Sequence, residues 1–398
     1  MPTDVFVTGM GIVSGIGIGV HETLTSLKEK HSGVGTLCHL NTIHDIPCAE
    51  VLYSDKQIKQ MLGLKEDEII TRTALMGIFA VKEAIEQASL SLNGSFKVAL
   101  INGTTVGGME KSELYYLDFL ENNTRNEYIE AHDCGACTER IADFFGGFSY
   151  VSTPSTACSS AANAIMLGAN LIQAGIVDIA IVGGSECITK FHLNGFKSLM
   201  ILDNEPCRPF DQTRAGLNLG EGAAFLVLES SKTITERKVQ ALCKLSGYGN
   251  ACDAYHQTAS SPEGKGAVLA MNAALYMSKL IPSDINYINA HGTGTPNNDE
   301  SEGQAIVTVF GQKPPYVSST KSATGHTTSA AGGVESVISI LALNNCFIPA
   351  TLNFKQQMES LPFAPVSEVI ENVDIKHVLS NSFGFGGNNS ALIFSKLM

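Results

Sequence analysis

Charged side chains are scarce in this sequence, and basic ones are scarcer than acidic ones. Only 16% of the 398 residues are charged, and 26 Lys and Arg stand against 39 Asp and Glu, which gives a formal net charge of −13. Nucleic acids and anionic membranes both attract basic surfaces. The charge balance therefore argues against either as the main partner and predicts an acidic, soluble enzyme.

Long apolar runs are also missing. The opening "MPTDVFVTGMGIVSG" has Asp4 near its start and is broken by glycines, unlike the apolar core of a signal peptide. No uninterrupted stretch predicts a helix that spans a membrane. We therefore expect a cytoplasmic protein whose 10 cysteines are reduced thiols.

Paired metal ligands are lacking as well. Cys134 and Cys137 form a C-x-x-C pair close to His132, but no second pair of ligands follows at the spacing of a zinc site. We therefore expect no bound metal.

Glycine and apolar residues, by contrast, are abundant. The sequence has 38 glycines and is 44% hydrophobic, enough for one large α/β unit or two intimate domains. Apolar runs such as "FKVALINGTTVGG", "VDIAIVGGSE" and "INYINAHGTG" end in glycine and alternate with helix-like segments. Runs that are apolar on both faces are typical of strands buried between helices. The pattern predicts an α/β fold.

A weak duplication predicts two similar halves, over residues 1–240 and 241–398. The first half opens on "VFVTGMG" and the second on "CKLSGYG", and we expect "DVFVTGMGIVSG" to form a strand followed by a glycine turn. Later, "YVSTPSTACSSAANAIML" has a counterpart in "YVSSTKSATGHTTSAAGG". Residues 38–68 and 110–145 are more polar and irregular, and we expect them to cap the fold or line an entrance.

Cys158 lies in an uncharged segment, "STPSTACSSAANAIMLGANLIQAG". Residues 161–172 are apolar nearly all round, which predicts a buried helix. Cys158 then falls at or just before the first turn, where unpaired N–H groups and the helix dipole favour a thiolate. A small cysteine packed in a core explains the segment equally well.

Two histidines follow predicted strands, in turns rich in small residues. His291 lies in "NAHGTGTPNNDESE" and His326 in "STKSATGHTTSAAGG". Because α/β enzymes hold their chemistry at the carboxyl ends of strands, the two together favour a catalytic site over core histidines. Asp299 and Glu302, three residues apart, are interpreted as a capping pair of the next helix, with a structural role.

Four motifs together resemble a known family. "TACSS", "NAHGTGTPNND", "KSATGHTTSAAGGVE" and "NSFGFGG" are similar to those of the elongating, Cys-His-His type of beta-ketoacyl-acyl-carrier-protein synthase, and the similarity runs from the first strand to the last. The resemblance implies a thiolase-like fold of five layers, αβαβα, built from two similar halves. It also implies a dimer whose interface shapes the acyl pocket.

The resemblance implies a decarboxylative Claisen condensation, in fatty acid biosynthesis or in type II polyketide or polyene assembly. An acyl chain passes to Cys158, and malonyl on acyl carrier protein then loses CO2 and attacks it. The carrier protein is the implied partner, and its phosphopantetheine arm brings the substrates without a further cofactor. We expect a homodimer, with a heterodimer containing a chain-length-factor-like subunit as the alternative.

The resemblance also implies residue roles. Cys158 is the nucleophile, and neutral His291 and His326 donate N–H bonds to the developing enolate. The backbone N–H groups of Cys158 and Phe385 form the oxyanion hole. An ion pair of Lys321 and Glu335 is expected to tune and orient His326.

Further positions match the family less directly. Thr293 and Thr295 match residues that hold the phosphopantetheine arm, and Phe385 and Phe196 match an aromatic gate. Asn388 stands where the family usually has threonine. Arg208 is interpreted either as a carrier-protein contact or as an internal ion-pair residue. Carrier proteins are acidic, so a basic patch is expected, and its candidates are Lys56, Lys59, Lys65 and Arg72.

A different function remains as the alternative. A non-condensing partner subunit, which only sets chain length in a heterodimer, resembles the synthases but lacks the nucleophile. The presence of Cys158, His291 and His326 favours the active enzyme. A degradative thiolase or a chain-initiating synthase would carry cysteine or asparagine in place of His326.

Overall fold

The structure is a computed structural model that describes residues 3–397. Ten strands follow one another along one hydrogen-bonded path, β11-β10-β14-β15-β9-β1-β8-β7-β5-β6. In the first half these are β1 (Val5–Ser14), β5 (Val98–Gly103), β6 (Phe148–Ser152), β7 (Ile179–Glu186) and β8 (Gly222–Ser230). In the second half they are β9 (Cys243–Cys252), β10 (Tyr287–Asn289), β11 (Tyr316–Ser318), β14 (His377–Gly384) and β15 (Asn388–Ser395).

The strands of the two halves have the same order and the same directions. Strands β6, β5 and β7 are parallel, β8 is antiparallel to β7, and β1 is antiparallel to β8. Strands β11, β10, β14, β15 and β9 repeat this order and these directions. The halves meet where β1 pairs with β9 over Val5–Val7. The expected α/β fold of two similar halves is confirmed.

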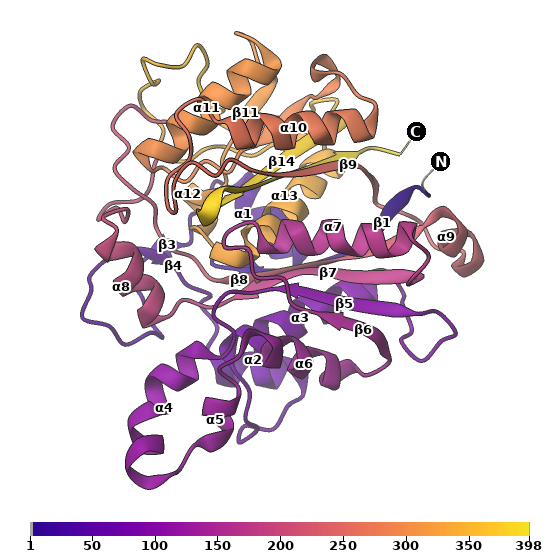
Figure 1. Cartoon of the computed structure of the whole chain (residues 1–398), viewed down its shortest axis with the longest axis vertical. Coiled ribbons are helices and arrows are strands. Elements are labelled where there is room, and N and C mark those ends of the chain that lie inside the picture. Colours follow the sequence, from indigo (N-terminus) through magenta and orange to yellow (C-terminus); the bar gives the residue numbers. More distant parts are fainter. Residues whose placement is uncertain (1–2, 398) are drawn as a thin grey trace.

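Helices fill the space between the two groups of strands and cover their outer faces (Figure 1). Helices α7 (Ser160–Gln173) and α13 (Ala331–Asn345) lie in the middle, which is why both are apolar nearly all round. Helix α3 (Arg72–Gln87) covers the first half, and α10 (Lys265–Ser278) covers the second, with α11 (Pro296–Phe310) beside it. Figure 1 shows the resulting five layers, α10/α11, sheet, α7/α13, sheet and α3.

The glycines of "VFVTGMG" and "CKLSGYG" lie inside strands, and the glycine turn expected after the first strand is confirmed at Gly15. Strand β1 continues through Gly9 and Gly11 to Ser14, and β9 continues through Gly247 and Gly249. A Cβ at any of the four would meet a helix carbonyl oxygen. The distances would be 2.2 Å (Gly9 to Ala84), 2.0 Å (Gly11 to Ala80), 2.3 Å (Gly247 to Ala274) and 2.3 Å (Gly249 to Ala270). Glycine therefore lets α3 and α10 approach their sheets closely in both halves.

The two polar, irregular segments lie at one end of the molecule. Residues 38–68 contain β4 (Cys48–Ala49) and α2 (Asp55–Leu62), and residues 110–145 contain most of α4 (Met109–Asn122), α5 (Asn126–Glu130) and α6 (Cys134–Phe145). Helices α4 and α5 project beyond the layers (Figure 1). Several apolar side chains of α4 are exposed, namely Leu114, Tyr116, Leu117 and Leu120.

The remaining elements are short. They are β2 (Gly17–Ile18), α1 (Val20–Lys28), β3 (Val34–Gly35), α8 (Lys190–Ser198), α9 (Ser231–Arg237), α12 (Lys321–Thr324), β12 (Phe347–Ile348) and β13 (Ile370–Glu371), with 3-10 turns at Pro282–Asp284, Thr328–Ala330 and Phe385–Gly387. Among residues 3–397, no helix combines the length and the apolar character needed to cross a membrane. Cys134 and Cys137 lie in the first turn of α6.

The close approach of α3 to β1 makes Gly9 sensitive to substitution. We expect Gly9→Val to lower the free energy of unfolding by about 1–3 kcal/mol, because the new side chain overpacks the interface. Thermal unfolding would measure it. Gly35→Val is the matched control, since a Cβ at Gly35 meets nothing within 4 Å. Equal losses for the two variants would contradict this account of the duplicated glycines.

Candidate active site

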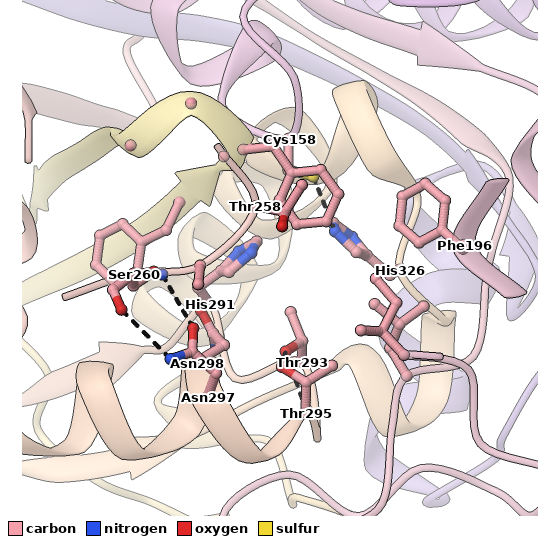
Figure 2. Close-up of a pocket in the computed structure, with 18 of the residues that line it drawn as sticks. Cys158, Phe196, Thr258, Ser260, His291, Thr293, Thr295, Asn297, Asn298 and His326 are labelled. Atoms are coloured by element: carbon pink, nitrogen blue, oxygen red, sulfur yellow. Dashed lines mark hydrogen bonds between the residues drawn. The ribbon is translucent and has the colours of Figure 1, made fainter. Parts of the chain in front are cut away.

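Four segments that are far apart in the sequence converge on one cavity of about 320 Å³. Cys158, His291, His326 and Phe385 all line it, and each follows the carboxyl end of a strand or the turn after it. The strands are β6 of the first half and β10, β11 and β14 of the second, and of these β6 and β11 hold equivalent positions at the two ends of the strand order. Figure 2 shows Cys158 and the two histidines facing the same space.

Cys158 lies in a tight turn just before α7. The helix begins at Ser160, with Ser159 as its N-cap residue, so the predicted place of the cysteine is confirmed. Ala157 has φ +52, a conformation that side chains other than glycine rarely adopt. Gly384 packs against this turn so closely that a Cβ there would lie 3.2 Å from the Cys158 nitrogen. The glycine-rich turn of Phe385 is thereby brought beside the nucleophile.

The Cys158 thiol is protonated in the resting site. Cys158 is 6% exposed, and burial raises the pKa of its thiol to about 12, an effect that the charge of Lys321 only partly opposes. The expectation of a resting thiolate is therefore wrong, because desolvation outweighs the field of the helix end. His326 Nε2 lies 3.1 Å from Cys158 Sγ and can take the proton as the sulfur reacts.

His291 and His326 form a neutral pair. Their rings lie 5.3 Å apart at an interplanar angle of 83°. Burial lowers the pKa of both imidazoles well below the usual 6.5, and the positive charge of Lys321 acts in the same direction. At neutral pH each ring therefore carries one N–H, which agrees with the predicted pair of neutral donors.

Lys321 contacts His291 and not His326, which corrects the expectation from the sequence. Its Nζ lies 3.3 Å from His291 Nδ1, donates to the His291 carbonyl oxygen at 2.6 Å and pairs with Glu335. In addition to burial, the Lys321 charge still lowers the pKa of His326, so the expected tuning holds without the expected contact. An ammonium group can only donate, so His291 Nδ1 accepts and its Nε2 keeps the proton.

The tautomer of His326, by contrast, is not fixed by a hydrogen bond at Nδ1. Among residues 3–397, no hydrogen-bond partner reaches its buried Nδ1. The ring can therefore hold its proton on either nitrogen, and Nε2 can accept from the thiol or donate to a bound group.

Asp299 and Glu302 are structural, but they do not act as a capping pair. Helix α11 has Thr295 as its N-cap residue, without a side-chain cap bond. Glu302 accepts hydrogen bonds from the backbone N–H groups of His291 (2.8 Å) and Gly292 (2.7 Å). Asp299 likewise accepts from the backbone N–H of Gly294 at 3.2 Å. The two carboxylates thus hold the turn that carries His291.

The pocket wall opposite Cys158 is polar. Thr293 and Thr295 line it, and their hydroxyl oxygens lie 2.9 Å apart (Figure 2). Further polar residues that the sequence reasoning missed line the cavity as well, namely Thr258, Ser260, Asn297 and Asn298. Ser260 N donates to Asn297 Oδ1 at 2.9 Å. The polar sequence "HQTASSPEG" around Ser260 was the available signal.

The apolar end of the cavity is closed by aromatic rings. Phe385 stacks on Phe196 with 5.8 Å between the ring centroids, and Ile201 and Leu217 line the cavity with them. Gly386 and Gly387 have φ of +80 and +79, which shape the turn after Phe385. The predicted gate residues therefore lie together, and their movement stays a prediction.

Asn388 joins the two halves behind the nucleophile. Its Oδ1 lies within hydrogen-bond distance of Ser159 Oγ (2.8 Å), Asn163 Nδ2 (3.0 Å) and Asn250 Nδ2 (2.8 Å). These donors come from the start of α7 and from β9. The departure from threonine thus supplies an amide oxygen to a polar network, a role that sequence reasoning missed.

The predicted basic patch is not formed as expected. Arg72 is buried and pairs with Glu221 at 2.6 Å and with Asp55 at 2.8 Å, so it offers no surface charge. Lys56 pairs with Glu66 at 2.9 Å.

Of the other two candidates, Lys65 is exposed and Lys59 is engaged. Lys59 donates to the backbone carbonyls of Glu66 and Glu68. Arg208 pairs with Asp203 at 3.3 Å and with Glu205 at 3.2 Å, which favours the internal ion-pair interpretation over a carrier-protein contact.

Two family models together match most of the chain. Residues 3–233 match the beta-ketoacyl synthase N-terminal domain, and residues 242–355 match the beta-ketoacyl synthase C-terminal domain. The chain is 32% identical over 406 residues to the 3-oxoacyl-[acyl-carrier-protein] synthase 2 of Staphylococcus aureus (strain N315), covering 98% of both chains.

Solved structures agree with this similarity. The ishigamide ketosynthase/chain length factor superposes with a TM-score of 0.92 at 29% identity, over 100% of both chains. A ketosynthase solved in complex with its type II polyketide synthase acyl-carrier protein, AntDE:AntF, superposes with a TM-score of 0.89 at 25% identity, also over 100% of both chains.

The contact between Lys321 and His291 predicts how the rings titrate. In the wild type, the NMR signals of His291 and His326 should not titrate between neutral pH and about 6.5, because their pKa values are depressed. Lys321→Met should raise the pKa of His291, since it removes a positive charge that disfavours the imidazolium. In the single variant the Glu335 carboxylate loses its ion-pair partner. The double variant Lys321→Met/Glu335→Gln also removes this unpaired charge and serves as the control. A wild-type His291 that titrates near 6.5 would contradict the assignment.

Proposed function

The chain belongs to the beta-ketoacyl synthase family, and we propose that Cys158, His291 and His326 carry out its decarboxylative condensation. The protein is an acyltransferase that forms a carbon–carbon bond, in keeping with its similarity to the 3-oxoacyl-[acyl-carrier-protein] synthase 2. The observation that carries the proposal is the 3.1 Å contact between Cys158 Sγ and His326 Nε2 in the same cavity as His291.

In the first step, Cys158 takes an acyl chain from a carrier protein. The sulfur attacks the thioester carbonyl, and its proton passes to His326 Nε2. The backbone N–H groups of Cys158 and Phe385 stabilise the oxyanion of the tetrahedral intermediate. When the intermediate collapses, the pantetheine thiolate leaves and takes the proton back from His326. Because the thiol is protonated at rest, this transfer must accompany the attack.

In the second step, malonyl on the carrier protein loses CO2. The electron pair of the broken carbon–carbon bond moves onto the thioester as an enolate, and the Nε2–H groups of His291 and His326 donate to its oxygen. The enolate carbon attacks the acyl group on Cys158. Cys158 leaves as a thiolate and regains a proton from solvent through His326. Lys321, which makes His291 Nδ1 an acceptor, supports the donor role of Nε2.

The substrates arrive on the phosphopantetheine arm of acyl carrier protein, and no further cofactor is needed for these steps. Thr293 and Thr295 are proposed to hold that arm, since their hydroxyl groups line the polar wall across the cavity from Cys158. The matched relatives include a fatty-acid-type synthase and polyketide ketosynthases, so elongation on a carrier protein is the activity common to them. We further propose residues 1–240 as the half that supplies the nucleophile and residues 241–398 as the half that supplies the histidines.

Loading of Cys158 tests this function. Incubation with acyl-carrier protein should give a single acyl adduct by intact-mass spectrometry, and peptide mapping should place it on Cys158. Cys207→Ala is the matched control, because burial raises the pKa of Cys207 to about 12 as well, yet no histidine lies beside it. An adduct on another cysteine would refute the assignment.

Cys158→Gln separates the two steps and tests the alternative of a non-condensing subunit. It should abolish acyl loading while malonyl decarboxylation, which needs only the two histidines, continues at a comparable rate. A wild-type protein that folds but neither loads nor decarboxylates would favour the non-condensing subunit instead.

Strand β6 and helix α4 are proposed as the surface of a dimer of two copies of this chain. Strand β6 pairs only with β5 among residues 3–397 and leaves one edge open, with Val151 41% exposed. An open edge strand readily pairs with another strand. The apolar side chains of α4, Leu114, Tyr116, Leu117 and Leu120, enlarge this exposed surface. The ishigamide ketosynthase, by comparison, is described together with a chain length factor.

The dimer is tested at Val151. Val151→Lys should convert the dimer to monomers in size-exclusion chromatography with light scattering, because two-fold symmetry brings like charges together at an apolar contact. Leu269→Lys, at an exposed leucine on α10, should leave the dimer intact. A monomeric wild type would overturn the homodimer, and pairing only with a homologous subunit would favour the heterodimer.

A further inference from the structure

A buried carboxylate outside the catalytic set connects three parts of the site. Glu186 ends β7 and is 0% exposed. Its oxygens accept hydrogen bonds from Thr104 Oγ1 at 2.6 Å and from Thr105 N at 3.0 Å, both just after β5. They also accept from Thr328 Oγ1 at 3.3 Å. Thr328 follows His326 by two residues, so Glu186 is tied to the turn that carries a catalytic imidazole.

Thr328 is held in a conformation that its side chain disfavours. Its φ is +44, which is uncommon for any residue except glycine and rarer still for a β-branched one. Such a conformation persists only where the surroundings over-determine it. The hydrogen bond to Glu186 is one of these constraints.

His192 lies on the other side of Glu186. It is 4% exposed in the first turn of α8, and its Nε2 is 3.7 Å from Glu186 Oε1. Thr189 caps this turn by accepting a hydrogen bond from His192 N at 3.1 Å. Burial lowers the pKa of the imidazole although Glu186 opposes the shift, so the ring is neutral at neutral pH. A neutral ring can pack against apolar neighbours without burying a charge.

The aromatic neighbour of His192 is Phe196, one turn further along α8. The two rings meet edge to face, with centroids 6.0 Å apart and an interplanar angle of 81°. Phe196 in turn stacks on Phe385 at 5.8 Å, and both line the cavity of Cys158. Figure 2 shows Phe196 beside His326 at this end of the cavity. His192 therefore touches the closing ring from behind, without lining the cavity itself.

Helix α8 also separates the catalytic cavity from a second, larger hollow. Phe196 lines the first, of about 320 Å³. Phe191, Asn194 and Gly195 line the second, of about 840 Å³, together with Tyr116 and Leu117 of α4. Phe196 therefore lines the catalytic cavity from the same helix whose other residues line the second hollow.

We propose that His192, buried between Glu186 and Phe196, is a positioning residue that holds Phe196 across the end of the cavity and so limits the length of acyl chain that Cys158 accepts. The inference rests on the proposed acyl transfer to Cys158. Aromatic pairs of this kind contribute enough to change a rate ratio by about two- to tenfold. His192 acts through Phe196 and does not touch the reacting atoms.

The test is a competition between acetyl- and dodecanoyl-carrier protein for Cys158, read by intact-mass spectrometry. In His192→Ala, the loading rate of dodecanoyl relative to acetyl should rise about two- to tenfold over the wild type. Malonyl decarboxylation should stay unchanged, because the two catalytic histidines are intact. His192→Phe keeps an aromatic ring against Phe196 and should return the ratio toward the wild-type value. Ser198→Ala, at an exposed position of the same helix that lines neither hollow, is the matched control.

The outcomes separate this inference from the proposed function. If the wild type loads Cys158 and His192→Ala leaves the chain-length ratio unchanged, the inference is overturned and the function stands. If the wild type loads no acyl chain at all, the proposed function fails. Should His192→Ala not fold, as judged by thermal unfolding, His192→Gln decides, because it also lacks the ring and must shift the ratio in the same direction.

Discussion

Burial of the Cys158 thiol beside a neutral imidazole is the constraint on which the rest of the site depends. Away from water the thiolate is costly, so the thiol stays protonated until it reacts. Both histidines are kept neutral by the same burial. Lys321, a charged side chain within the site, forms an ion pair with Glu335. A dry cavity of neutral groups suits chemistry in which charge appears only during the reaction, on a thioester oxygen.

The duplicated architecture explains how such a cavity is assembled. The turns after β6 of the first half and after β10, β11 and β14 of the second line one cavity, so the first half brings Cys158 while the second brings His291, His326 and Phe385. Backbone positions are then fixed by buried carboxylates. Glu302 holds the turn of His291, and Glu186 holds the turn after His326 through Thr328. The catalytic turns are thus braced by residues that do not react.

Several expectations from the sequence were wrong for one shared reason. Lys321 was assigned to His326, five residues away, but it contacts His291, thirty residues away. Arg72 was assigned to a surface patch, but it pairs with Glu221 in the interior. Glu302 was assigned to a helix cap, but it accepts hydrogen bonds from the backbone of His291 and Gly292. In each case a partner distant in the sequence decided the outcome.

The sequence by itself determined the α/β fold, the two halves, the helix after Cys158 and the identity of the cysteine and histidines, because periodicity, glycine spacing and motifs are local. Only the tertiary structure decided the protonation of Cys158, the partner of Lys321, the burial of Arg72 and the link from Glu186 through His192 to Phe196. These properties depend on desolvation and on contacts between residues far apart in the chain, which no local pattern records.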